Sequence, residues 1–271
     1  MTSNPVVAIT GASSGIGAAL AQQHAVDGWD VLMVNRSIER SQPVIDQIAA
    51  AAPGATIDVV QADLADHDSI RDAAAQLSER GRLDRFVNNA GVLMGEKVMS
   101  AHGVEMSAQV NTLAPYLFGR LLRPVMEGGT TVLVTTGGIN KAKALDLDEL
   151  TDPTEFTKLF GSYVQSKLAA TAVMNAFAHE DPASTYLSIE PGAVKTPMTS
   201  GDGMPRWLVP IRNLFFSTPE KGAAKIYDAI GGDHPSGAYI QRGKPHAFPA
   251  DIDDPGVHAS VLAWCRDHTG V

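Results

Sequence analysis

The sequence predicts an α/β protein with a parallel sheet that helices cover on both faces. Short runs of β-branched or apolar residues recur along the chain, and each is followed by a longer segment with helical periodicity. A glycine-rich stretch comes directly after the first run, "VVAIT". Strands that alternate with helices form βαβ units with right-handed crossovers, and such units build parallel sheets. No segment repeats with the period of a solenoid, so that class is excluded.

The strands are expected where the apolar runs lie. In chain order they are residues 6–10, 30–35, 56–61, 82–89, 130–136, 184–191 and 237–240. Periodicity predicts helices over residues 16–26, 43–51, 69–79 and 106–126, and one more that holds Tyr163. Two segments depart from this rhythm. Residues 137–161 are a polar insertion, and residues 197–217 combine prolines and glycines with bulky apolar side chains.

Length and composition indicate one globular domain over residues 1–271. A chain of 271 residues, 44% hydrophobic and 19% charged, suits a large α/β domain and is too polar for membrane spans. The N-terminus has no basic region and only a five-residue apolar run, so we expect neither a signal peptide nor an anchor. We therefore expect a cytoplasmic protein.

Charge and potential ligands exclude several function classes. A net charge of −9 without a lysine or arginine cluster argues against nucleic-acid binding. Cys265 is the sole cysteine, which excludes an internal disulfide and a cysteine-based zinc cage. The eight histidines lack ligand spacing, so we predict no metal site.

The glycine-rich stretch predicts a nucleotide site. Gly11, Gly15 and Gly17 follow the first strand and open the first helix, next to Ile16. Glycines there allow a tight turn and bring backbone amides within reach of a pyrophosphate at the positive helix end. Ser13 and Ser14 can add donors. The alternative is a turn with no ligand.

The end of the second strand predicts which dinucleotide binds. An acidic residue there would hold the ribose hydroxyls of NAD, but the sequence has Arg36 between Asn35 and Ser37. A guanidinium can clamp a 2′-phosphate, so Arg36 predicts NADP. The alternative is that Arg36 is simply an exposed arginine. Asp63, followed by Leu64, can accept from the adenine amino group, although a helix N-cap explains it almost equally well.

Five motifs in order resemble the short-chain dehydrogenase/reductase family over nearly the whole chain. They are "TGASSGIG", "NNAG" at 88–91, Asn111 in "VNTLAPYL", Tyr163 with Lys167, and "PGAVKT" at 191–196. Within that family the chain is similar to the NADP-dependent, retinol dehydrogenase-like branch. The likeness there rests on "HGVEMSAQVNTLAPYLFGRLL", the insertion before Tyr163, "STPEKGA" and "LAWCRDHTG".

The resemblance implies a Rossmann-type, doubly wound sheet of about seven strands and hydride transfer between a nicotinamide and a carbonyl or alcohol. It makes Asn111, Tyr163 and Lys167 catalytic, with Asn111 supporting a water relay and Lys167 binding the nicotinamide ribose. It also implies a homodimer or homotetramer through the helices that hold Asn111 and Tyr163. The residues that it places beside the cofactor are Asn89, Ala90, Gly91, Pro191, Gly192, Val194 and Thr196.

The spacing of Tyr163 and Lys167 has a chemical reason. A carbonyl that receives a hydride becomes an alkoxide and must take a proton, and the reverse reaction needs a base. A free phenol has a pKa near 10, too high for a base at neutral pH. A lysine four residues on lies on the same helix face, and we expect its ammonium, together with the positive nicotinamide of the oxidised complex, to lower that pKa. The alternative is a solvated helix face.

The usual serine of the family is replaced in this chain. Thr136 stands at the matching place and keeps a hydroxyl donor for the substrate oxygen, although its methyl group restricts χ1. Thr135 is an alternative donor, but only one of the two side chains can point at the site.

Residues 197–217 are expected to form a flap over a hydrophobic small-molecule substrate, with a packed helix as an equal alternative. Val92, Leu93 and Met94 are expected to line the same pocket. The bulky apolar residues of the segment are Met198, Met204, Trp207, Leu208, Val209, Phe215 and Phe216.

We therefore predict an NADP(H)-dependent oxidoreductase acting on an aldehyde, ketone or alcohol of retinoid or steroid type. Two alternatives remain. One is a non-catalytic NADP-binding sensor or interaction protein on the same fold, which only the Thr136 replacement favours. The other keeps the chemistry but acts on a carbon-carbon double bond or epimerises a sugar.

Overall fold

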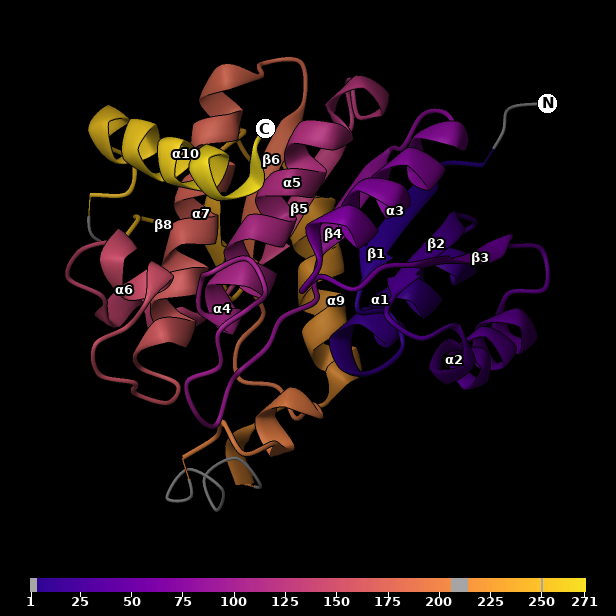
Figure 1. The fold of residues 1–271 in the computed structure, drawn as a ribbon. Helices are drawn as coiled ribbons and strands as arrows, with labels where there is room; N and C mark the ends of the chain where they lie inside the picture. The colour runs from indigo at the N-terminus through magenta and orange to yellow at the C-terminus, as the bar shows by residue number, and fades with distance from the viewer. Residues whose placement is uncertain (1–3, 206–213, 250) are drawn as a thin grey trace.

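The computed structural model describes residues 4–205, 214–249 and 251–271. These residues form one eight-stranded sheet in the order β3-β2-β1-β4-β5-β6-β7-β8 (Figure 1). All neighbours are parallel except β7 and β8. The strands are β1 Val6–Thr10, β2 Asp30–Asn35, β3 Ile57–Gln61, β4 Arg85–Asn88, β5 Thr130–Val134, β6 Thr185–Glu190, β7 Tyr239–Gln241 and β8 Lys244–His246.

Helices cover both faces of the sheet because successive strand side chains point to opposite faces. Val7 and Ile9 of β1 pack with α1 (Gly15–Val26), α2 (Ile38–Ala51) and α9 (Pro219–Ile230). Ala8, between them, packs on the other face with α3 (His67–Glu79) and α5 (Ala114–Leu121). Burial on both faces explains why the strands read as continuous apolar runs. The predicted doubly wound fold is confirmed.

The strand count differs from the prediction of about seven. The eighth strand, β8, is three residues long and pairs antiparallel with β7. All three of its residues are exposed, so no apolar run marks it in the sequence.

Two predicted helices have different bounds. Helix α2 begins at Ile38, five residues before the predicted start at Pro43, because the Ser37 side chain accepts from the Arg40 amide and caps it. The predicted helix over residues 106–126 divides into α4 (Met106–Ala108), the π-helical η1 (Gln109–Leu113), α5 and the short η2 (Arg123–Val125). π-Helical turns are frequent at functional sites, and η1 holds Asn111.

The insertion at residues 137–161 is partly regular. A short 3₁₀ helix, η3 (Gly137–Lys141), follows β5, and α6 (Leu147–Thr151) follows η3. The long helix α7 (Ser162–Glu180) then begins directly before Tyr163. In the segment predicted as a flap, the described residues include the short 3₁₀ helix η4 (Met198–Ser200), and residues 214 and 215 are also helical.

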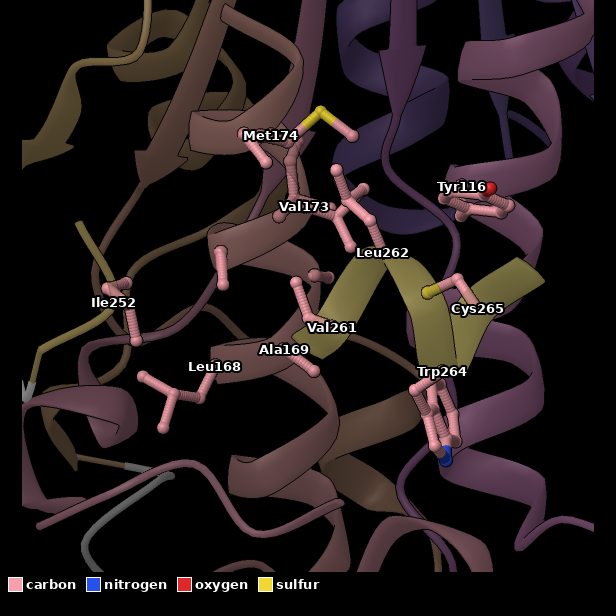
Figure 2. Packing of buried hydrophobic residues seen from close by; sticks show 14 of the residues in the cluster. Tyr116, Leu168, Ala169, Val173, Met174, Ile252, Val261, Leu262, Trp264 and Cys265 are labelled. Atoms are coloured by element: carbon pink, nitrogen blue, oxygen red, sulfur yellow. The ribbon is translucent and has the colours of Figure 1, made fainter. Parts of the chain in front are cut away.

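The C-terminal helix α10 (Pro255–Thr269) lies across α7. Figure 2 shows Val261, Leu262 and Cys265 of α10 beside Val173 of α7, all within one buried cluster. Tyr116 Oη of α5 also donates to the carbonyl oxygen of Val271, at 2.6 Å. The chain thus buries the apolar faces of α5 and α7 itself. A homodimer or homotetramer stays a prediction.

No helix in the described part of the chain combines the length and apolar character that a membrane crossing requires. Among the same residues, no group of three histidine, cysteine, aspartate or glutamate side chains is placed to hold a metal ion.

Candidate active site

A cleft of about 740 Å³ opens at the carboxyl ends of the strands. The loops after β1, β4, β5 and β6 line it, and β1 and β4 are the neighbours at which the strand order reverses. Ligands bind at such a switch point in open α/β sheets. Predicted site residues that line the cleft are Gly11, Ser13, Ser14, Gly15, Ile16, Asn89, Ala90, Gly91, Thr136, Tyr163, Lys167, Pro191, Gly192, Val194 and Thr196.

The glycine-rich turn has little room for side chains. Gly11 and Gly15 have φ of 68° and 57°, a region that glycine adopts without strain. A Cβ on Gly17 would lie 2.3 Å from the Gly11 carbonyl oxygen. Ser14 is the N-cap of α1, but its side chain makes no capping hydrogen bond. The first N–H groups of α1 therefore remain available for an anionic group.

Hydrogen bonds that Thr10 accepts join the turn to the loop after β4. Asn89 Nδ2 donates to the Thr10 carbonyl oxygen at 2.9 Å, and the amide of Ala90 donates to Thr10 Oγ1 at 3.0 Å. Thr10 is a residue that the sequence analysis missed. It lies about 80 positions from its partners, so only the fold brings them together.

Asn111 does not line the cleft but lies directly behind it. Its Oδ1 accepts from the Val92 amide at 2.8 Å, and its Nδ2 donates to the Val92 carbonyl at 3.0 Å. Nδ2 also donates to Ser166 Oγ at 3.0 Å. Asn111 thus links the loop after β4 to α7 through Ser166, a second residue that the sequence analysis missed.

Thr136, not Thr135, offers its hydroxyl to the site. Thr135 also lines the cleft, but it is buried and its Oγ1 pairs with Thr171 Oγ1 of α7 at 3.2 Å. Thr136 is hydrogen-bonded to Tyr163. Their different partners on α7 therefore decide between the two candidates.

Lys167 lies at the end of β5. Its Nζ donates to the carbonyl oxygen of Val134 at 2.9 Å and would be 3.4 Å from a Cβ on Gly91. The side chain is buried, and burial lowers the pKa of Lys167 to about 8 because a charge is poorly solvated there.

In the protein alone the pKa of Tyr163 is raised, and the lowering expected in the oxidised complex stays a prediction. Burial raises it to about 12, and the hydrogen bond from Thr136 offsets part of that rise. The ammonium of Lys167 is bonded to the Val134 carbonyl oxygen instead of to the phenol. In the protein alone, Tyr163 is therefore a protonated phenol.

The residues expected at the adenosine end lie outside the lining of the main cleft. Arg36 is exposed at the end of β2. Asp63 Oδ1 accepts from the Ala65 amide at 3.0 Å, whereas the N-cap of α3 is Asp66. The N-cap alternative for Asp63 is therefore wrong. The Leu64 carbonyl accepts from Gln109 Nε2 at 3.1 Å, which ties this loop to η1.

The substrate end is apolar. Val92, Leu93 and Met94 line the cleft, as do Met198, Met204 and Phe216 from the segment predicted as a flap. A Cβ on Gly203 would lie 2.2 Å from the Leu93 carbonyl oxygen, so this segment packs closely on the loop after β4. Phe215 is 73% exposed and does not line the cleft. Trp207, Leu208 and Val209 lie outside the described residues.

Comparisons with known proteins agree with this geometry. Residues 5–145 match the sequence profile of the family described as short chain dehydrogenase. Mouse retinol dehydrogenase 11 is 30% identical over 230 residues, which are 83% of this chain and 73% of that protein. A Streptomyces sp. (strain C5) protein, provisionally named daunorubicin C-13 ketoreductase DnrU, is 33% identical over 72% of this chain and 68% of its own length.

Solved structures share the fold. A short chain dehydrogenase from Burkholderia cenocepacia J2315 in complex with NADP has a TM-score of 0.70 and 24% identity, over 90% of this chain and 98% of that one. An alcohol dehydrogenase from the archaeon Thermococcus sibiricus, complexed with 5-hydroxy-NADP, has a TM-score of 0.68 and 23% identity, over 88% and 95% of the two chains.

Proposed function

Because the chain belongs to the short-chain dehydrogenase/reductase family, we propose that it is an NADP(H)-dependent oxidoreductase acting on the carbonyl or alcohol of a hydrophobic substrate. The observation that carries this proposal is the convergence of Thr136, Tyr163 and Lys167 in one cleft with the glycine-rich turn.

The cleft fits a dinucleotide. Gly17 has no space for a Cβ, and the N-terminus of α1 carries no side-chain cap. Both features suit a pyrophosphate held by backbone amides. Gly11, Ser13, Ser14, Gly15 and Ile16 would hold the phosphates, and Arg36 would hold a 2′-phosphate through charge-assisted hydrogen bonds.

The loops after β4 and β6 would hold the rest of the cofactor. Asn89, Ala90 and Gly91 lie on one side of the cleft, and Pro191, Gly192, Val194 and Thr196 on the other. Asp63 and Leu64 would contact the adenine. Lys167 would bind the nicotinamide ribose. The bound nicotinamide supplies or accepts the hydride.

Tyr163 acts as the acid in the direction of reduction. A phenol with a pKa of about 12 keeps its proton at neutral pH, so it can donate that proton to the oxygen of the reduced carbonyl. Thr136 donates a hydrogen bond to the same oxygen and fixes its position. Asn111 holds Val92 and α7 in register behind the cleft. These roles would supply the proton and the orientation that carbonyl reduction requires.

The hydrophobic substrate is supported by the apolar wall of Met94, Met198, Met204 and Phe216. We further propose that residues 1–271 act as one dinucleotide-binding domain, with residues 197–217 as a flap over the substrate. The names of the retinol dehydrogenase and ketoreductase relatives are consistent with a lipophilic carbonyl or alcohol.

The test is to incubate the protein with a panel of lipophilic aldehydes and ketones and to measure turnover as the loss of NADPH absorbance. We expect at least one carbonyl to be reduced with NADPH, and faster than with NADH. Tight binding of NADPH with no turnover of any carbonyl would instead indicate a non-catalytic NADP-binding protein.

A further inference from the structure

The insertion at residues 137–161 reaches the substrate end of the cleft at two places. Helix η3 follows Thr136 directly and brings Lys141 to the cleft. The turn before α7 brings Leu159 and Phe160 to the same place. A smaller neighbouring pocket is lined by Lys141, Phe160 and Val164, so the three side chains are neighbours there.

Lys141 provides a positive charge at this apolar mouth. Its Nζ lies 4.8 Å from the centroid of the Phe160 ring, a cation–π distance that keeps the ammonium at the rim. None of the ion pairs in the described part of the chain involves Lys141. The charge is therefore available to a ligand.

The lining of the cleft offers no negative charge to balance Lys141. Among the described residues that line it, no side chain is an aspartate or glutamate, and the other cation is Lys167. Lys167 is buried and already bonded to Val134, so it does not face the substrate end. No negatively charged side chain among the described lining residues would therefore repel an anionic group of a substrate.

The turn that carries Leu159 and Phe160 is strained. Leu159 has φ of 37°, which a leucine rarely adopts. A Cβ on Gly161 would lie 2.5 Å from the Thr157 carbonyl oxygen, so the turn also requires glycine there. Phe160 is left 44% exposed. Strain of this kind is concentrated at ligand sites, and an apolar ligand would cover the exposed ring.

We propose that the insertion selects carbonyl substrates that carry an anionic group, which Lys141 binds while Leu159 and Phe160 contact the apolar part. This inference rests on the proposed function, because it names the substrate class of the same site. A 3₁₀ helix rises about 2 Å per residue, so Lys141 Cα lies on the order of 10 Å from Thr136 Cα. The anion is accordingly separated from the reacting carbonyl by an apolar chain of similar length.

The test compares ω-oxo fatty acids with their methyl esters over a series of chain lengths. Wild-type protein should reduce the acid with a kcat/KM about tenfold above that of the ester, with an optimum at an intermediate length. Lys141→Ala should remove this preference by raising KM for the acid, and Lys141→Glu should reverse it. In both variants, kcat/KM for the ester and KM for NADPH should change less than twofold.

Lys143 supplies the matched control, because it is an exposed lysine of the same insertion that does not line the cleft. Lys143→Ala and Lys143→Glu should leave the preference for the acid intact. Equal kcat/KM for acid and ester in the wild type, or an equal effect of the substitutions at both lysines, would overturn the inference and leave the proposed function standing.

A binding measurement separates failure of this inference from failure of the proposed function. Decanoate has no carbonyl to reduce, so calorimetry with the NADP-loaded protein reports the anion site without turnover. Weaker binding to Lys141→Glu than to Lys143→Glu supports the inference even if no carbonyl is reduced. Equal binding to both variants would contradict it.

Discussion

The ammonium of Lys167 donates a 2.9 Å hydrogen bond to the carbonyl oxygen of Val134, at the carboxyl end of β5. This bond fixes a buried cation between α7 and the sheet, beside Gly91. Burial of the charge costs solvation energy, so the position does not favour stability, but it suits the proposed hydrogen bond to a ribose hydroxyl.

Lys167→Met should stabilise the protein without cofactor. The pKa of Lys167 is lowered from 10.5 to about 8, and each tenfold change in proton affinity is worth about 1.4 kcal/mol, so the charge costs about 3 kcal/mol at neutral pH. Loss of the hydrogen bond to Val134 lowers the free energy of unfolding of the variant by about 1 kcal/mol. We expect a net gain of about 2 kcal/mol in the free energy of unfolding, measured by urea denaturation at pH 7.

The gain in the free energy of unfolding from Lys167→Met should depend on pH. A base with a lowered folded-state pKa carries its full penalty below pH 8, and the penalty disappears as the pH rises from about 8 to about 10.5. The advantage of Lys167→Met should therefore shrink over that window. An advantage that grows with pH would contradict the assignment of a buried, charged lysine.

The rate should fall on the alkaline side. The pH dependence of kcat/KM reports groups of the free enzyme, and Lys167 loses its charge above pH 8. We expect kcat/KM for NADPH to decline with an apparent pKa of about 8, measured at saturating carbonyl. A profile that stays flat to pH 10 would show that the charge of Lys167 does not assist cofactor binding.

Arg36 should decide the preference for NADPH. A lost charge-assisted hydrogen bond costs about 1.5 to 3 kcal/mol, so Arg36→Leu should raise KM for NADPH about tenfold to a hundredfold. KM for NADH should change less than twofold. Arg40→Leu is the control, since Arg40 is also exposed and lies four residues on. Equal effects of Arg36→Leu on both cofactors would remove the argument for NADP.

Gly17→Ala should damage the cofactor cradle. The added Cβ would approach the Gly11 carbonyl oxygen at 2.3 Å and Asn89 Nδ2 at 2.5 Å, so the backbone must shift at a cost of about 1 to 3 kcal/mol. We expect a lower Tm and at least tenfold weaker NADPH binding by fluorescence titration. Gly54→Ala, at a glycine with open space around it, should change neither quantity. Unchanged binding in Gly17→Ala would contradict the proposed pyrophosphate site.

Much of the fold was predictable because its signals are local. Each strand buried on both faces has an apolar run, and the glycines of the first turn are adjacent in the chain. Strand β8 was missed because its three residues are exposed. Helices α9 and α10 were also not predicted, although each begins with a proline, which is a local start signal.

The site was predictable only in part, because only some of its signals are local in the sequence. Motif residues lie in the cleft, but the contacts that hold them join distant positions, as in the bond between Asn111 and Ser166. The raised pKa of Tyr163 in the protein alone could not be predicted from spacing, since it depends on how deeply the fold buries the phenol. Lys141 stands out only once η3 brings it beside Phe160.

The central claim is that the hydroxyl of Tyr163 gives its proton to a carbonyl oxygen while the hydride arrives from NADPH. The most direct measurement is single-turnover transfer of deuterium from labelled NADPH to a lipophilic aldehyde, read by mass spectrometry of the alcohol. Wild-type protein should produce the labelled alcohol, and Tyr163→Phe should bind NADPH normally but form it at least a thousandfold more slowly. Labelled alcohol formed by Tyr163→Phe at the wild-type rate would contradict the account.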